Sequence, residues 1–151
     1  MRLEDALKTT KFENEQHKAT LNLLYTSYWL KYHMSAAMKD NGITAEQFNV
    51  MRILKGTYPK DMCVKDIGSR MIEKSSNVPR IIDKLLVKKL VERHPSVEDK
   101  RETMISLTEK GIELLKSANE QLANHTKEMI GLNEEESMQL NALLEKMRRS
   151  D

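Results

Sequence analysis

Two short segments with helical apolar spacing lie unusually close together in the middle of this chain. They are "VKDIGSRM", residues 64–71, and "SSNVPRIIDKLLVKKL", residues 75–90, and only "IEK" separates them. Three residues leave room for a tight bend and nothing longer, so the pattern predicts a helix-turn-helix motif. The predicted buried stripe of the second helix comprises Val78, Ile81, Ile82 and Leu85.

The opposite side of this second helix is polar and partly cationic, with Ser76, Asn77, Arg80 and Lys84. Pro79 indicates where the helix begins. If Ser75 or Ser76 is the N-cap, Pro79 lies in or just after the first turn, where a missing backbone amide costs little. We therefore expect a serine cap at the start of this helix.

A β-hairpin follows, because "LVER" (90–93) and "ETMISL" (102–107) read as strands joined by the polar loop "HPSVEDKR" (94–101). Helices are predicted on both sides of this central region. One runs from about Glu13 to Lys39, and another begins at a Thr44 and Gln47 capping box. After the hairpin, Thr108 can cap a long helix and Asn133 a last one. The apolar positions of the last helix are Leu140, Leu143, Leu144 and Met147.

This order of elements predicts a mainly α fold with a small β-hairpin wing (α+β). Residues 44–108 form a winged helix-turn-helix core, and helices in 1–40 and 109–151 flank it within a single domain, 1–151. The composition agrees, since 39% hydrophobic and 32% charged residues with only 5 Gly and 3 Pro favour amphipathic helices. The chain shows no signal peptide and no apolar run long enough to cross a bilayer, so we expect a cytoplasmic protein without a membrane partner.

Positive charge gathers in the middle of the chain. Residues 60–101 hold 11 basic and 7 acidic side chains, a balance of +4, whereas the other residues hold 14 basic and 16 acidic, a balance of −2. A Lys-rich stretch is more often a solvated surface than a binding site, so this asymmetry alone does not identify a nucleic-acid partner.

The stretch "DKRETMISLTEKG", residues 99–111, resembles the signature of the multiple-antibiotic-resistance regulator (MarR) family of bacterial transcription factors. The matching residues are Asp99, Arg101, Leu107, Thr108 and Gly111, and the resemblance extends over nearly the whole chain. It implies a homodimer that binds a palindromic operator on double-stranded DNA as a ligand-responsive repressor. Apolar faces on the first and last helices support dimerisation independently, although packing within one chain is the alternative.

The second helix of a helix-turn-helix enters the major groove with its N-terminal side chains facing the bases. The predicted DNA-binding residues of this helix are Ser75, Ser76, Asn77, Arg80 and Lys84. Arg80 is the strongest candidate for reading a base, because Arg binds guanine with two hydrogen bonds, while Ser and Lys84 suit phosphates. Each of these residues could instead be an ordinary cap or a solvated side chain.

At the wing, Arg101 is predicted to enter the minor groove and Asp99 to position it, as the paired Asp and Arg of the family do. Lys100 and His94 are candidates for phosphate contacts, and a solvated loop is an equal alternative for each. Lys89 departs from the family, which commonly has glycine before the first wing strand, so the geometry of the helix exit is open.

The resemblance also implies an effector site, expected where Tyr25, Trp29 and Tyr32 of the first helix meet the winged region. Small aromatic acids are the expected class of ligand, and a role of these rings in the dimer core is the alternative. We expect no cofactor, no metal site and no enzymatic activity, because the four His are scattered and no nucleophile or phosphate-loop motif occurs.

Two further alternatives concern single features. Cys63 could be a redox sensor, but a buried structural cysteine is favoured. The whole chain could be a winged-helix module for protein interaction that never reads DNA. The basic middle region, Arg80 and Arg101 favour DNA binding instead.

Overall fold

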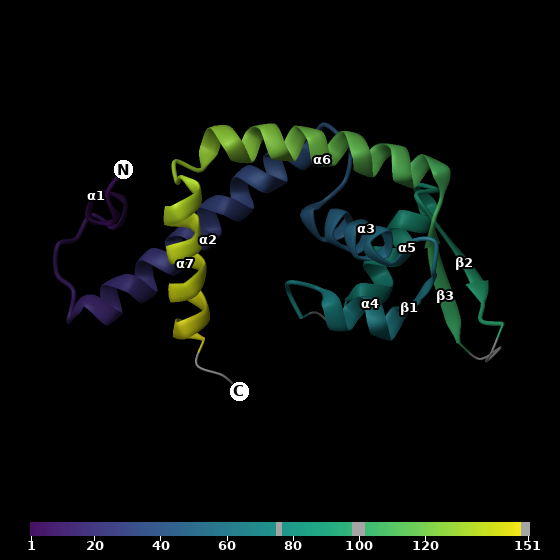
Figure 1. The fold of residues 1–151 in the computed structure, drawn as a ribbon, viewed down its shortest axis with the longest axis horizontal. Coiled ribbons are helices and arrows are strands. Elements are labelled where there is room, and N and C mark those ends of the chain that lie inside the picture. Colours follow the sequence, from purple (N-terminus) through teal and green to yellow (C-terminus); the bar gives the residue numbers. More distant parts are fainter. Residues whose placement is uncertain (75–76, 98–101, 149–151) are drawn as a thin grey trace.

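The computed structural model describes residues 1–74, 77–97 and 102–148. They form a packed region with a small sheet, and helices that extend from it (Figure 1). The helices are α1 (Leu3–Leu7), α2 (Glu15–Lys39), α3 (Ala45–Thr57), α4 (Val64–Arg70), α5 (Val78–Val87), α6 (Glu109–Met129) and α7 (Glu134–Met147). The strands are β1 (Met62–Cys63), β2 (Val91–Pro95) and β3 (Thr103–Leu107). We call residues 43–107 the winged lobe, and α2 and α7 the helical arms.

The winged lobe contains the predicted helix-turn-helix and hairpin. Its sheet is antiparallel with the order β1-β3-β2, and the hairpin register joins Val91 to Leu107 and Pro95 to Thr103. The mainly α fold with a small hairpin is therefore confirmed. Strand β1 was not predicted, because two residues cannot show an alternating pattern and only pairing with β3 makes them a strand. Strand β2 also continues through His94 and Pro95, which the sequence placed in the loop. As an edge strand it tolerates a proline.

The core of the lobe is closely packed and includes the predicted buried stripe of α5. Its most completely buried side chains are Val50, Met51, Ile67, Ile82, Leu85, Leu90 and Ile105. Helix α3 begins at the predicted capping box, in which Thr44 accepts from the Gln47 amide at 3.2 Å and Gln47 accepts from the Thr44 amide at 3.3 Å. Gly42, just before it, has the left-handed φ of +64° that glycine adopts without strain.

Helix α5 begins later than the sequence predicted. Its N-cap is Asn77, whose side chain makes no capping hydrogen bond, and Val78 and Pro79 form the first turn. The predicted serine cap is therefore wrong, and Ser75 and Ser76 themselves lie outside the described residues. The later start is physically consistent, because Pro79 occupies the second helical position, where no intrahelical amide bond is needed.

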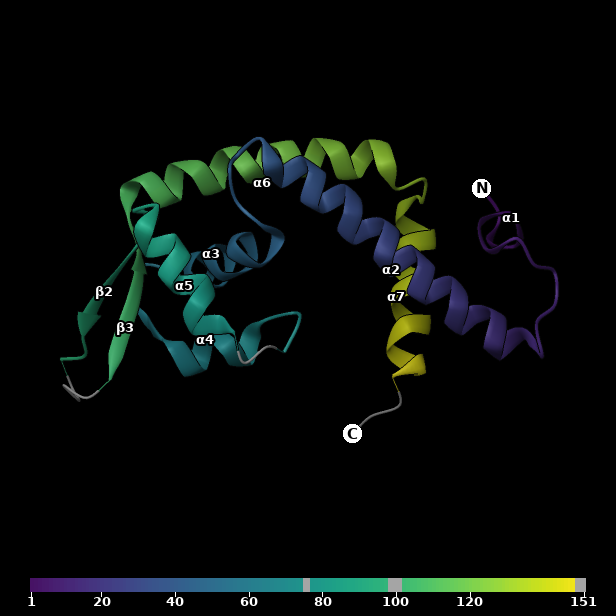
Figure 2. The same ribbon diagram turned by 180° about the vertical axis from the view of Figure 1, so that it is seen from behind.

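The helical arms extend away from the lobe. Helix α6 packs against both α2 and the lobe, while α7 turns sharply away at the far end of α6 (Figures 1 and 2). Helix α7 begins at the predicted Asn133 and Glu136 capping box, but none of its residues is buried. The short α1 was not predicted, and Lys18 binds Glu4 at 2.7 Å, which ties α1 to the start of α2 and lowers the pKa of Glu4. No helix of the described residues is both long and apolar enough to cross a membrane.

Candidate nucleic-acid interface

Helix α5 presents two different faces. Val78, Ile81, Ile82 and Leu85 are buried as predicted. Arg80, Asp83 and Lys84 are exposed on the other side, next to the exposed Asn77. A short helix with one buried stripe and an opposite, partly cationic stripe has the form of a recognition helix, since the buried stripe fixes its orientation and leaves the cations accessible. The other predicted DNA-binding residues, Ser75, Ser76, Lys100 and Arg101, and the wing residue Asp99 lie outside the described residues.

An ion pair that the sequence did not reveal joins α5 to the wing. The Arg93 guanidinium of β2 lies 2.9 Å from the Asp83 carboxylate of α5. Both side chains are well exposed, so the pair adds little to stability. It nevertheless links β2 of the wing to the recognition helix α5, and in it Arg93 pairs with the one acidic side chain on the outward side of α5. No local pattern could have indicated this contact, because ten residues and a turn separate the partners.

The C-terminal end of α5 is tied to the start of α3. The Lys88 ammonium donates to the Gly42 carbonyl at 2.6 Å and to the buried Gln47 side chain at 2.8 Å. Lys88 thereby satisfies a buried polar group and holds the end of the helix. A shallow depression lies beside this contact, between α5 and the start of α3. It is lined by Thr44, Gln47, Arg80, Asp83, Lys84, Val87 and Lys88.

The junction of α5, β2 and α6 explains the glycine and threonine of the signature stretch. The Thr108 hydroxyl donates to the Lys89 carbonyl at 2.9 Å and accepts from the Gly111 amide at 3.0 Å. A Cβ on Gly111 would lie 2.0 Å from the Leu90 carbonyl oxygen, so only glycine fits there. Lys89 itself has a φ of +58°, the left-handed conformation that a glycine would adopt. The helix exit thus keeps its geometry despite the departure at Lys89.

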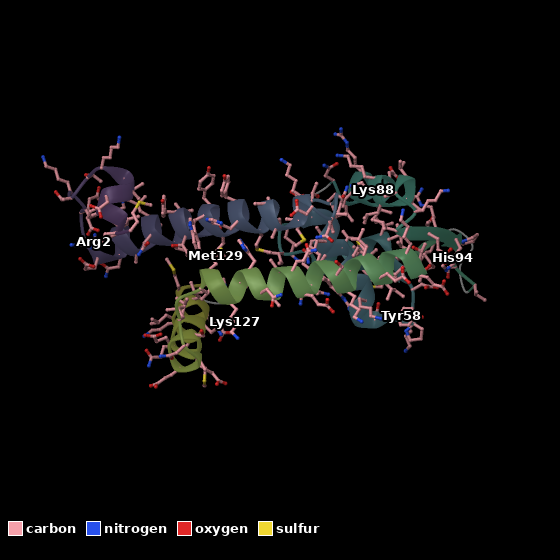
Figure 3. All side chains as sticks on the ribbon, turned by 90° about the horizontal axis from the view of Figure 1, so that it is seen from above. Arg2, Tyr58, Lys88, His94, Lys127 and Met129 are labelled. Carbon is pink, nitrogen blue, oxygen red and sulfur yellow. The ribbon has the colours of Figure 1, made fainter. Side chains whose placement is uncertain are left out.

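His94 and Cys63 both lie opposite Met104 in the sheet of the wing, and the environment of each differs from the one that the sequence suggested. The His94 Nε2 lies 2.8 Å from an Asp61 carboxylate oxygen, so this ring contacts the edge of the sheet instead of belonging to a polar loop (Figure 3). Cys63 is half-buried, not buried, and it precedes α4 as its N-cap. Within residues 1–74, 77–97 and 102–148, no group of three His, Cys, Asp or Glu side chains is arranged to hold a metal ion.

A pocket of about 190 Å³ lies between α2, α3 and the segment that follows α4. Its apolar lining includes Met34, Phe48, Met71 and Ile72, and its charged lining is Lys31, Glu46, Arg52 and Glu73. The Lys31 ammonium lies 2.6 Å from the Glu73 carboxylate and so joins α2 to the segment that leads into α5. A hydrogen bond from the Thr44 side chain lowers the pKa of Glu46, which keeps this carboxylate ionised.

The three aromatic residues predicted for the effector site do not line this pocket. Tyr25 and Trp29 are half-buried and Tyr32 is exposed. The Trp29 and Tyr32 rings pack against His33 at centroid distances of 4.7 and 5.4 Å, and His33 lies 5.8 Å from His125 of α6. On α2 the pocket is lined by Lys31, Met34 and Ser35, on a side that the spacing of aromatic residues does not mark.

Comparison with known proteins identifies the class. The model of a winged helix DNA-binding domain matches residues 43–111. The chain is 32% identical over 110 residues to the HTH-type transcriptional regulator MhqR of Bacillus subtilis, covering 72% of this chain and 73% of the relative. Together with the exposed face of α5, these matches define a DNA-binding transcriptional regulator of the winged helix class, and they decide against a module that only binds proteins.

Solved structures share the fold. A putative MarR-like transcription regulator from Bacillus cereus has the same fold, with a TM-score of 0.79, 24% identity, and coverage of 89% of this chain and 96% of that one. A structure of Bordetella bronchiseptica BpsR, described with the regulation of its DNA binding by 6-hydroxynicotinic acid, has a TM-score of 0.74 at 24% identity, covering 86% of this chain and 93% of that one. The chain belongs to the MarR family of winged helix-turn-helix transcriptional regulators.

Proposed function

We propose that this protein acts as a homodimer on a palindromic operator, with α5 of each subunit in the major groove. The observation that carries this proposal is the two-sided α5, on which Asn77, Arg80 and Lys84 are exposed opposite a completely packed stripe. Arg80 reads a guanine, and Lys84 contacts phosphate. From the sequence alone, Ser75, Ser76 and Lys100 join the phosphate contacts, Arg101 enters the minor groove and Asp99 positions it.

The apolar faces of the helical arms support the dimer. On α2, Leu24, Tyr28 and Tyr32 form an exposed stripe at successive helical turns, and on α7 Leu140, Leu143 and Met147 are exposed. Faces of this kind mark protein interfaces. A chain that ends at Asn133 is expected to sediment as a monomer. A stable dimer of that shortened chain would contradict the proposal. In the full dimer, the two α5 helices are expected roughly 34 Å apart, one turn of DNA.

The DNA contacts are tested by comparing Arg80→Ala with Lys84→Ala on duplexes selected from a random pool by the unaltered protein. Arg80→Ala should weaken binding to the preferred duplex by about 1 to 3 kcal/mol and relax the choice of base at one position in each half-site. Lys84→Ala should weaken binding to all duplexes. It should also reduce the slope of log affinity against log salt concentration by about one unit. Equal losses on preferred and random duplexes for Arg80→Ala would refute base reading by Arg80.

In the wing, the direction of the change in DNA affinity tests the proposed roles of Arg101 and Asp99. Arg101→Ala should lower affinity for many sequences, most strongly those with A·T-rich flanks, because it removes a cation from the minor groove. Asp99→Ala should also weaken binding, although it deletes a negative charge near phosphates, since Arg101 then loses the group that orients it. Tighter binding by Asp99→Ala would show that repulsion between Asp99 and the DNA phosphates dominates, and it would contradict the positioning role of Asp99.

A small aromatic acid is the proposed effector, and release from DNA the proposed response, as for a repressor. The regulation of BpsR by 6-hydroxynicotinic acid supports this class of ligand. The pocket between α2 and α3 supports the site, because its apolar lining suits a ring. Among the described residues Arg52 makes no ion pair, so its guanidinium, 5.9 Å from the Phe48 ring, can bind a carboxylate.

The effector is tested with a panel of hydroxylated benzoic and nicotinic acids. Active acids should lower DNA affinity and change Trp29 fluorescence. Arg52→Ala should abolish the response, and Arg70→Ala, outside the pocket, should retain it. If no acid changes either signal, the pocket has another role. As a regulator of bacterial type, the protein is proposed to act in the cytoplasm without catalysing a reaction.

A further inference from the structure

Val87 occupies an unusual place on α5. With about 100° between successive residues of an α-helix, Val87 lies almost directly opposite the centre of the buried stripe, on the same line as Arg80. Its side chain is 84% exposed, although α5 buries its other aliphatic side chains wholly or in part. A branched apolar residue therefore stands at the C-terminal end of the face that the proposed function directs towards DNA.

The surroundings of Val87 are ordered. Lys88, the next residue, donates two hydrogen bonds to Gly42 and Gln47 of the neighbouring segment, so the last turn of α5 is fixed (Figure 3). Asp83, one turn earlier, is engaged by Arg93 at 2.9 Å. The outward line of α5 thus presents a cation at Arg80, a carboxylate paired with Arg93 at Asp83 and two methyl groups at Val87.

We propose that Val87 determines sequence specificity by packing its methyl groups against the C5-methyl group of a thymine in the major groove. An aliphatic side chain cannot bind phosphate, and the thymine methyl is the one apolar group that a base presents in this groove. A single exposed valine is common on protein surfaces, but here it lies in line with Arg80 on a fixed helix end. The inference rests on the proposed placement of α5 in the major groove.

The spacing along α5 makes the inference more specific. Seven residues separate Arg80 from Val87, which corresponds to about 10 Å along the helix axis. Base pairs are stacked about 3.4 Å apart, so the thymine should lie about three base pairs from the guanine that Arg80 reads. The thymine should occur once in each half-site.

The experiment uses duplexes selected from a random pool by the unaltered full-length protein, with each thymine replaced in turn by deoxyuridine, which lacks only the methyl group. At one thymine per half-site, deoxyuridine should weaken binding about fourfold, the effect of one buried methyl group. Val87→Ala should bind thymine and deoxyuridine equally at that position. Val97→Ala, which alters another exposed valine, should still distinguish them.

Two results would overturn the inference. One is that no deoxyuridine weakens binding of the unaltered protein, and the other is that Val87→Ala keeps the same preference for thymine. Neither result affects the placement of α5, which the loss of base choice in Arg80→Ala tests separately. Because Val87 is exposed, Val87→Ala should fold normally, and its unchanged binding to random duplex confirms this.

Discussion

The winged lobe and the helical arms differ in how much of their apolar surface is buried within one chain. In the lobe, most large apolar side chains of α3 and α5 are buried, and polar contacts such as Lys88 with Gln47 satisfy buried groups. In the arms, Met38 is the single buried residue of α2, and α7 buries none among its described side chains. Figure 3 shows the lobe at one end of α6, near Lys88 and His94, and α7 at the other end, near Lys127 and Met129.

This difference indicates that the two regions are stabilised by different means. The lobe gains its stability from burial within one chain, which does not depend on protein concentration. The arms expose apolar faces that a second copy covers in the proposed homodimer, so the stability of the arms should depend on association and hence on protein concentration. Substitutions in the lobe should therefore change the free energy of unfolding, and substitutions in the arms should change the dimer dissociation constant.

The largest effect is expected in the lobe, from Gly111→Ala. The added Cβ would lie 2.0 Å from the Leu90 carbonyl oxygen, so the start of α6 must move away from the junction of α5 and β2. We expect a loss of about 3 kcal/mol or more in the free energy of unfolding, measured by urea denaturation at fixed protein concentration. Gly56→Ala in α3, where the Cβ meets open space, is the matched control and should not destabilise. Equal stability of both variants would show that the junction is loose.

A smaller but selective effect is expected in the arms, from the double substitution Leu143→Glu and Met147→Glu on the apolar face of α7. Burying two carboxylates in an interface is costly, so the dimer dissociation constant should rise about 100-fold or more, as measured by sedimentation. Unfolding of the lobe should remain cooperative. Glu145→Lys, on the opposite side of α7, should leave the dimer intact. Dissociation by this control would indicate general disruption of α7.

The two capping boxes allow the same chemical change in both regions. Thr44→Ala removes the cap of α3 and should lower the free energy of unfolding of the lobe by about 1 kcal/mol. Asn133→Ala removes the cap of α7 and should instead raise the dimer dissociation constant about fivefold, the equivalent of the same energy. If Asn133→Ala destabilises the lobe and leaves dissociation unchanged, the two regions are not independent.

The smallest expected effect is a gain in stability. Lys89 adopts a φ of +58°, which is strained for a residue with a side chain, so Lys89→Gly should stabilise the lobe by about 0.5 to 1 kcal/mol in denaturation experiments. Lys116→Gly, within the regular helix α6, provides the contrast and should destabilise by about 1 kcal/mol. Destabilisation by Lys89→Gly would mean that the lysine side chain itself contributes to the junction.

The sequence by itself determined the features that depend on near neighbours. The capping boxes at Thr44 and Asn133, the buried stripe of α5 and the pairing of "LVER" with "ETMISL" arise from residues a few positions apart, and all are present. The order of these local elements was sufficient to predict the winged helix-turn-helix. The exposed position of Arg80 followed in the same way, because a helix that buries one stripe must expose the other.

Only the tertiary structure decided the features that join distant residues. Strand β1 exists because β3 pairs with it, and α5 begins at the buried Val78, after the N-cap Asn77. The contacts of Arg93 with Asp83 and of His94 with Asp61, and the pocket beside Lys31, bring together side chains from separate elements. The signature Gly111 was visible in the sequence, but its reason, the nearby Leu90 carbonyl, arises from the close approach of two chain segments that no local pattern encodes.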